Sequence, residues 1–163
     1  MIRHVMKSKL SNAKAIDFFD FMVNPPPEIY RYWLPKEHHE FHVVKRSKNS
    51  PVSDLIYFDQ HISPKHRLNF YAVIRLAKKP NRIIYQMQKF GINIPGYLDL
   101  KFTDTADGLM LTETIRIGFG GIGKALDPFI RIVFNKAFFE AMNGHHKREW
   151  TNLANILKHK GGL

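Results

Sequence analysis

A histidine and a glutamate four residues apart, His145 and Glu149, lie on the apolar face of the helix that the C-terminal sequence predicts. At about 100° per residue, six side chains fall within roughly 80° of one another on a helical wheel. They are Phe138, Met142, His145, Glu149, Leu153 and Ile156. A buried charge has to be paired, hydrogen-bonded or bound to a metal, and both polar groups are metal ligands. The pair is therefore a candidate metal site, and the alternative is an ordinary ion pair on a helix surface.

Two further carboxylates lie in segments whose apolar side chains recur at every second position, as in half-buried strands. In 109–119, Glu113 shares a face with leucine and isoleucine side chains, and in 54–62 one face ends in Asp59 and His61. We expect both strands to point these groups at the helix. The alternatives are that Glu113 pairs with one of the 25 lysine and arginine residues and that Asp59 belongs to a strand-end turn.

A third group of polar residues, Glu37-His38-His39-Glu40-Phe41-His42, lies where a short helix is expected to give way to the first strand of a sheet. Side chains alternate along a strand, so either His38 or His39 points inward, but not both equally. The sequence leaves this choice open. The alternative interpretation is a solvated junction between two elements.

The composition predicts one domain over residues 1–163, with 44% hydrophobic residues to form its core. The chain contains no cysteine, which excludes disulfides, thiolate metal sites and cysteine nucleophiles. A metal would have to be held by His, Asp or Glu. The first residues, MIRHVMKSKL, lack the apolar core of a signal peptide, and no apolar run approaches the ~18 residues of a membrane span. We therefore expect a soluble cytoplasmic protein.

The formal net charge of +11 raises the question of a nucleic-acid partner. The basic residues are scattered along the sequence in twos and threes, without a long basic helix or an arginine-rich arm. Nucleic-acid binding is therefore disfavoured, and a solvated cationic surface is the simpler interpretation.

Periodicity and turn residues predict two short helices, then a meander of antiparallel strands, then a long C-terminal helical region. The helices are expected at 13–22 and 28–33, separated by a proline run, and the helical region at 123–159 with a bend near Asn143-Gly144. The strands are expected at 41–46, 54–62, 67–77, 82–90, 96–104 and 109–119. The glycine-rich segment 118–123 lacks the G-K-S/T ending of a phosphate-binding loop, and we interpret it as a flexible strand-to-helix turn.

This order of elements predicts an α+β fold in which the long helix covers one face of a curved antiparallel sheet. A sheet rich in phenylalanine and tyrosine on its inner face commonly encloses a cavity beneath such a helix. Tyr57, Tyr85 and Tyr97 are candidates to donate hydrogen bonds to a phenolic or ketone oxygen of a ligand there. Glu113 is a further candidate for lining the cavity.

Several segments, taken in order, resemble the START/Bet v 1-like superfamily, the helix-grip proteins that are also called SRPBCC or polyketide cyclase-like. The resemblance rests on Tyr32–Phe41, Tyr57–Ile62, Thr114–Phe119 leading into Leu126-Asp127-Pro128, and His145–Glu149 with Asn152-Leu153. It implies a helix-grip fold that binds a small hydrophobic molecule in an internal cavity.

Within the superfamily the arrangement is similar to the branch of diacetylphloroglucinol and phloretin hydrolases. That branch cleaves a carbon–carbon bond next to a ketone with zinc held by two histidines and two acidic residues. The resemblance implies that His145, Glu149 and either His38 or His39 bind zinc. The remaining acidic ligand would be Asp59, where the branch uses glutamate, or else Glu113.

Two functions remain as hypotheses. The leading one is a zinc-dependent hydrolase that cleaves a carbon–carbon or ester bond in a small aromatic or ketone-bearing molecule. The alternative is a carrier or sensor of a lipid or other hydrophobic ligand that performs no chemistry. Metal content separates the two, because only the hydrolase needs a stoichiometric ion.

Overall fold

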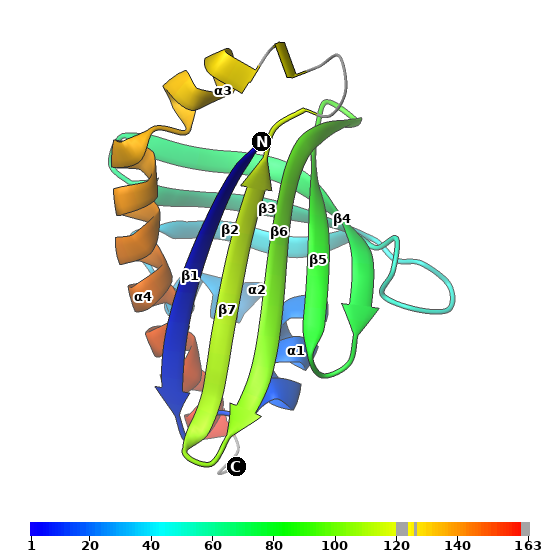
Figure 1. Ribbon diagram of the computed structural model, residues 1–163. Coiled ribbons are helices and arrows are strands. Elements are labelled where there is room, and N and C mark those ends of the chain that lie inside the picture. Colours follow the sequence, from blue (N-terminus) through cyan, green and yellow to red (C-terminus); the bar gives the residue numbers. More distant parts are fainter. Residues whose placement is uncertain (120–123, 126, 161–163) are drawn as a thin grey trace.

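The computed structural model describes residues 1–119, 124–125 and 127–160. Seven antiparallel strands form one curved sheet in the order β1-β7-β6-β5-β4-β3-β2 (Figure 1). The strands are β1 (Ile2–Ser11), β2 (His38–Lys45), β3 (Leu55–Ser63), β4 (His66–Lys78), β5 (Arg82–Lys89), β6 (Ile92–Thr105) and β7 (Gly108–Ile117). The helices are α1 (Ala15–Val23), α2 (Pro27–Trp33), α3 (Asp127–Val133) and α4 (Lys136–Lys160). The predicted α+β helix-grip architecture is confirmed.

The chain begins with a strand, so the prediction that two helices precede the sheet is wrong. β1 pairs with β7 along its whole length, from Ile2 opposite Ile117 to Ser11 opposite Gly108. Met6 and Leu10 are buried, while the lysines between them point away from the core. Ile2, Met6, Ser8 and Leu10 share one face of β1, and the basic residues on its other face hide this alternation from a search for apolar runs.

The two N-terminal helices form where proline and aromatic residues require them. α1 buries Phe18, Phe19 and Phe21 against the sheet and ends before the proline run 25–27, because proline cannot continue the hydrogen-bond ladder. α2 begins at Pro27, since the fixed φ of proline suits the first turn of a helix. α2 packs against β2 and α4, which brings the start of β2 close to the long helix.

The C-terminal region contains two helices rather than one. The side chain of Asn135 accepts a hydrogen bond from the Phe138 backbone N–H at 3.1 Å and caps the start of α4. α4 then runs without interruption through Gly144 to Lys160 and packs against β1 and β3, so the sheet curves around it (Figure 1). The predicted turn at 118–123 falls largely outside the described residues. Within the described residues, no helix is long and apolar enough to cross a bilayer.

Aromatic side chains fill most of the space between the sheet and α4. Trp33 and Trp150 lie with their ring centroids 5.3 Å apart at the centre of the core, with Phe18, Phe41 and Phe58 around them. A small internal cavity of about 30 Å³ remains between these rings and α4. The predicted cavity beneath the helix therefore has room for about one or two water molecules and none for an aromatic ligand.

Candidate metal centre

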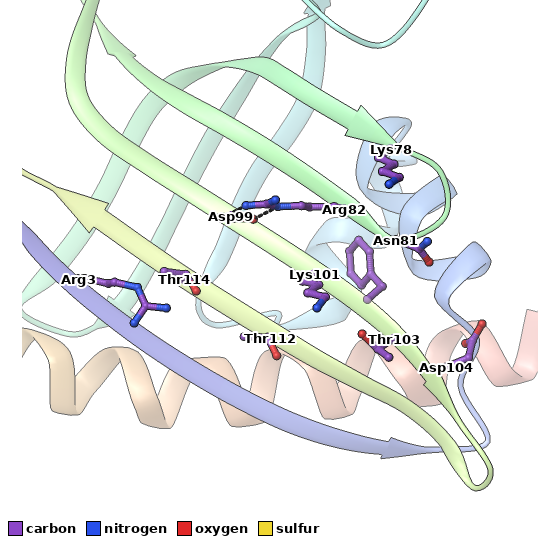
Figure 2. Close-up of a pocket in the computed structure, with 11 residues that line it drawn as sticks. Arg3, Lys78, Asn81, Arg82, Asp99, Lys101, Thr103, Asp104, Thr112 and Thr114 are labelled. Carbon is purple, nitrogen blue, oxygen red and sulfur yellow. Dashed lines mark hydrogen bonds and ion pairs between the residues drawn. The ribbon is translucent and has the colours of Figure 1, made fainter.

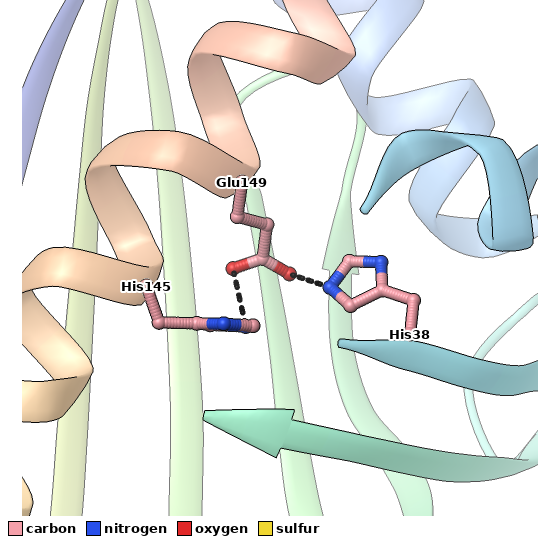
Figure 3. Close-up of side chains that lie close together, drawn as sticks. All are labelled: His38, His145 and Glu149. Atoms are coloured by element: carbon pink, nitrogen blue, oxygen red, sulfur yellow. Dashed lines mark ion pairs between the residues drawn. The ribbon is translucent and has the colours of Figure 1, made fainter. Parts of the chain in front are cut away.

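Three side chains with metal-binding atoms converge between α4 and the start of β2 (Figure 3). His38 Nε2 lies 3.6 Å from one carboxylate oxygen of Glu149, and His145 Nε2 lies 3.7 Å from the other. The ligand atoms of the three residues all lie within 4.8 Å of one another, and all three residues are buried. Both distances to Glu149 are longer than a hydrogen bond.

Three of the four imidazole nitrogens of this cluster lack hydrogen-bond partners among the described residues. Neither ring nitrogen of His38 has one, and neither has His145 Nε2. Buried polar atoms in folded proteins are nearly always hydrogen-bonded, because leaving one unpaired costs about 1–3 kcal/mol. Two of these atoms, His38 Nε2 and His145 Nε2, face the Glu149 carboxylate, which is the arrangement of a site that could hold a ligand (Figure 3).

His38 is held in place by its aromatic neighbours. Its ring stacks on Tyr30 at 4.2 Å between centroids and meets the edge of Trp33 at 4.8 Å. Trp33 in turn donates its indole N–H to the backbone carbonyl of Glu149. The aromatic residues of α2 therefore position the histidine of β2 against the carboxylate of α4.

His145 is oriented by a second carboxylate. Its Nδ1 lies 2.6 Å from Glu37 Oε2, and Arg148 donates to both oxygens of Glu37 at 2.8 and 3.1 Å. Since Glu37 accepts the Nδ1 proton, Nε2 carries the lone pair and faces the Glu149 carboxylate. Two acceptors that face each other across 3.7 Å repel one another unless a proton or a metal ion lies between them. In metal-binding histidines, the ring nitrogen that does not bind the metal usually donates a hydrogen bond to a carboxylate or a carbonyl, as His145 Nδ1 does to Glu37.

The electrostatics of the cluster favour a cation. Burial raises the pKa of Glu149 well above its usual value, and the charges of Glu113 and Glu37 raise it further. Burial and the neighbouring His145 lower the pKa of His38 to about 2. Burial also lowers the pKa of His145, although Glu37 opposes that shift. Neutral imidazoles and an uncompensated carboxylate together form a donor set that fits Zn²⁺.

The 30 Å³ cavity adjoins this cluster. Glu149, Glu113, Gln60 and Tyr30 are among its lining residues, and the Tyr30 hydroxyl donates to Gln60 Oε1 at 2.7 Å. Its volume is enough for about one or two waters next to the Glu149 carboxylate. Catalytic zinc sites have this arrangement of three protein ligands and one position left for water.

Of the five predicted metal ligands, the structure brings His38, His145 and Glu149 together and leaves His39 and Asp59 elsewhere. His39 Nε2 lies 2.6 Å from His61 Nδ1, outside the cluster. The pairing of β2 with β3 shifts register between His38 and Glu40, and it is His38 that lies against Tyr30 and Trp33. Packing therefore selects His38 rather than His39 as the inward-pointing histidine, a choice that the alternation of side chains left open.

The expectation that Asp59 points at the helix is wrong. Phe58 and Gln60 line the internal cavity, so the alternation of β3 places Asp59 on the opposite face. There it forms a bidentate ion pair with Arg67, whose Nε and Nη2 atoms donate to the two carboxylate oxygens at 2.9 and 2.6 Å. The hydrogen bond from Arg67 holds the pKa of Asp59 below its usual range.

Glu113 points inward, as its position among apolar residues predicts, but its carboxylate has other partners. Oε2 accepts hydrogen bonds from His146 Nδ1 at 2.6 Å and Trp150 Nε1 at 3.0 Å, and the far nitrogen of His146 lies 3.0 Å from Ser8 Oγ. Glu113 therefore lines the cavity within a hydrogen-bonded network, outside the three-residue cluster.

None of the three tyrosines proposed as ligand donors is in the cavity lining. Tyr57 packs against Tyr71 on the outer face of the sheet, and Tyr97 lies under Arg116. Tyr85 is fully buried, and its hydroxyl donates to the Met22 carbonyl at 2.9 Å. Tyr57 and Tyr97 therefore lie away from the cavity, and Tyr85 lies in the core with its hydroxyl already hydrogen-bonded.

Sequence reasoning missed His146 and Tyr30. His146 lies four residues from both Met142 and Trp150, and this spacing marks a second buried stripe on α4. The stripe is wider than expected because the sheet curves around the helix. Tyr30 gave a weaker signal, as one aromatic residue in a short helix.

Several hollows of suitable size for a small molecule lie outside the core, among them the following two. One, of about 760 Å³, lies on the outer face of the sheet, where Arg82 binds Asp99 and where Arg3 and Lys101 add charge (Figure 2). Because this hollow is on the face opposite α4, it is separate from the histidine cluster. The other, of about 680 Å³, is a groove lined partly by Glu37 and Arg148, so it directly adjoins the outer partner of His145.

Comparison with solved structures identifies the fold. A protein from Mycobacterium smegmatis superimposes with a TM-score of 0.61 at 11% identity, covering 97% of this chain and 92% of that one. A major latex-like protein from Panax ginseng gives 0.57 at 8% identity, with 89% and 97% covered. The chain has the Bet v 1-like helix-grip fold. An AHSA1-like protein from Aeromonas hydrophila is another helix-grip neighbour, with a TM-score of 0.53, 10% identity and 97% and 96% coverage.

No family model and no curated protein matches the sequence. Identities this low establish the helix-grip fold alone, so the function has to be argued from the site.

Proposed function

We propose that this helix-grip protein binds one divalent cation, with zinc the best fit, through His38 Nε2, His145 Nε2 and the Glu149 carboxylate. One observation carries the proposal: buried imidazole nitrogens without hydrogen-bond partners converge on a buried carboxylate. Two histidines and one glutamate form a recurrent ligand set of catalytic zinc, and the adjoining cavity leaves a position for water.

We further propose that the protein is a hydrolase. A zinc ion at this site would supply Lewis-acid activation of a water molecule and of a carbonyl oxygen. The chain's own residues would orient the reactants: Glu37 fixes the His145 ring, and the hydrogen-bonded Tyr30 and Gln60 face the water-sized cavity. The aromatic residues around the cavity exclude bulk water, which strengthens every electrostatic interaction within it.

The groove outside Glu37 is the proposed point of entry for the substrate, and the contact between Glu37 and His145 would have to open for a carbonyl group to reach the buried ligands. Its volume of about 680 Å³ is in the usual range for small-molecule sites, whereas the interior cavity is too small for an aromatic ring. Apolar residues such as Ile62 and Pro64 line it together with the charged Glu37 and Arg148. This mixture suits a small aromatic or ketone-bearing molecule, the substrate class that the sequence resemblance implies.

A carrier without chemistry is the second candidate, supported by the helix-grip fold. A carrier of a large hydrophobic ligand would need the aromatic core to open, because the internal cavity measures about 30 Å³. Organic extraction of the purified protein separates the candidates. A stoichiometric apolar ligand in protein that binds no zinc would favour the carrier.

The test of the hydrolase is turnover by zinc-loaded protein on a panel of aryl esters and acylated phenols. We expect activity that a chelator removes and added zinc restores, and that Glu149→Gln and His38→Ala abolish. His39→Ala is the matched control, because it removes the neighbouring histidine outside the cluster. A protein that binds zinc but turns over none of these substrates would contradict the hydrolase and leave the metal centre standing.

A further inference from the structure

Helix α3 is apolar on more than one side, although only one side packs against the rest of the described residues. Ile130 and the following Phe134 pack against the core cluster around Phe138. Phe129, Ile132 and Val133 point outward, and Ile132 remains 70% exposed. A helix that is apolar all round is normally buried. The outward side of α3 is therefore an apolar surface that no described residue covers.

The turn between β5 and β6 presents a second unexplained apolar group. Phe90 is 89% exposed and has a left-handed backbone with φ of +52°, followed by Gly91 at +75°. Two-residue hairpin turns of this kind favour Asn-Gly or Asp-Gly, and a bulky side chain is rare in this region. Ile92 beside it is also exposed. The Lys89 ammonium lies 5.6 Å from the centroid of the Phe90 ring, but no described residue buries the ring at this tip.

Both features lie at the same end of the molecule (Figure 1). Strand pairing places Ile2, Ile117 and Gly96 side by side, so the β5–β6 turn projects beyond the end of β7. Asp127, the first residue of α3, binds the Phe119 backbone N–H and the Met1 amino group at that end. Of nine exposed large apolar side chains among the described residues, six lie here. They are Met1, Phe90, Ile92, Phe129, Ile132 and Val133.

Basic residues surround this apolar end. The segments 62–67, 88–97 and 127–136 contain five lysine or arginine residues and a single acid, Asp127. Arg67 is engaged by Asp59, and Lys136 lies 3.7 Å from Glu140, which leaves Lys65, Lys89 and Arg131 as the cations of this end. Two copies of the chain that met through it would bring like charges together, which disfavours self-association. Separate apolar tips among cations suit a fluid anionic surface better than a shaped protein pocket.

We propose that this end docks on an anionic lipid bilayer. Phe90 and the outward side of α3 enter the interface, and the lysines and arginines contact the headgroups. The groove beside Glu37 includes Pro64 of the β3–β4 turn at the same end, so docking would bring its mouth near the membrane. This last link rests on the proposed function, whereas docking itself does not.

Vesicle binding tests the proposal. Sedimentation with phosphatidylcholine vesicles is compared with sedimentation with vesicles of equal parts phosphatidylcholine and phosphatidylglycerol. We expect the wild type to bind only the anionic vesicles, and Phe90→Asn to bind them about tenfold more weakly, as loss of one interfacial aromatic group implies. Asparagine tolerates the left-handed backbone, so this variant should keep or raise its melting temperature. Tyr32→Asn, which removes an exposed aromatic residue on α2, is the matched control and should bind normally.

Three results would overturn the docking proposal: no binding to the anionic vesicles, equal loss in Phe90→Asn and Tyr32→Asn, or a dimer that Phe90→Asn dissociates in the absence of lipid. The last would assign the surface to a second copy of the chain. None of these vesicle-binding measurements depends on zinc or on turnover. A negative result would therefore overturn membrane docking without bearing on the proposed hydrolase.

Discussion

Helix α4 presents two neighbouring histidines, His145 and His146, to two different carboxylates. His146 donates to Glu113 at 2.6 Å, Trp150 donates to the same oxygen, and Ser8 meets the far side of the imidazole. His145 and His38 face Glu149 at 3.7 and 3.6 Å, and both Nε2 atoms lack partners. The residue types are nearly the same, but the hydrogen bonding is complete in one network and incomplete in the other.

This difference separates a structural network from a binding site. Burial pushes the pKa of Glu113 up, but the hydrogen bonds and charge of His146 and Trp150 outweigh it and hold that pKa below the usual value. The pKa of Glu149 is raised because burial and two nearby carboxylates act on it. One carboxylate is stabilised as an anion by the protein, whereas the other is stabilised by a proton or by the metal ion that we propose.

The largest expected effect is the stabilisation of the protein by zinc. At free zinc a thousandfold above Kd, the free energy of unfolding should rise by about 4 kcal/mol, because the folded state alone presents the three ligands together. His145→Ala should show no zinc-dependent rise in thermal unfolding, and His39→Ala should show the wild-type rise. An equal zinc response in all three proteins would assign the metal to surface histidines and remove the distinction between the networks.

Breaking the fully hydrogen-bonded network of Glu113, His146 and Trp150 should have the next largest effect on stability. Glu113→Leu leaves His146 Nδ1 and Trp150 Nε1 buried without an acceptor, and should lower the free energy of unfolding by about 3 kcal/mol in urea denaturation. The zinc-induced rise should persist in this variant. If it disappears, Glu113 is a ligand, as the second alternative from the sequence holds.

Removing the charge of Glu149, whose hydrogen bonding is incomplete, should raise the free energy of unfolding rather than lower it. In metal-free protein, Glu149→Gln should raise the free energy of unfolding by about 1 kcal/mol near neutral pH, since an uncompensated buried carboxylate is lost. The folded pKa of Glu149 is raised, so the folded state binds the extra proton and wild-type stability falls as pH rises above about 4.5. Urea denaturation between pH 5 and pH 8 should show this decline in the wild type and a weaker one in the variant. A destabilised Glu149→Gln at neutral pH would show that the carboxylate is already satisfied.

The smallest expected effect is at Asp59, which lies outside both networks. Asp59→Asn removes the ion pair with Arg67 and should lower the free energy of unfolding by about 1 kcal/mol at neutral pH. The folded pKa of Asp59 is depressed, so this contribution is present above the usual aspartate pKa and is lost as pH falls through the depressed value. Denaturation from pH 6 down to pH 2 should therefore bring variant and wild type together at the acid end. Loss of zinc binding in this variant would restore Asp59 as a ligand.

Much of the fold could be predicted from the sequence, because most of its elements have one apolar face. The meander from β2 to β7 follows from alternation and turn residues, and α4 follows from its apolar stripe. β1 was missed since lysines hide its half-buried pattern. The division between α3 and α4 was missed as well, because it depends on the Asn135 cap.

Only part of the candidate site could be predicted from the sequence. His145 and Glu149 share a helix, where spacing alone fixes their relation. His38 depends on a register shift in β2, and Asp59 on which face of β3 is inside, and both are set by packing across the sheet. Glu37 lay within the polar cluster of the sequence, but its bond to His145 joins residues 108 positions apart.

The most direct test of the metal centre is elemental analysis of untagged protein purified without added metal, compared for wild type, His38→Ala, His39→Ala and Glu149→Gln. The account predicts about one zinc or similar divalent ion per chain in wild type and His39→Ala, and a loss of the ion in His38→Ala and Glu149→Gln. Metal-free wild type that stays metal-free after zinc is added and excess is removed would contradict it, as would loss of the ion in His39→Ala with retention in His38→Ala.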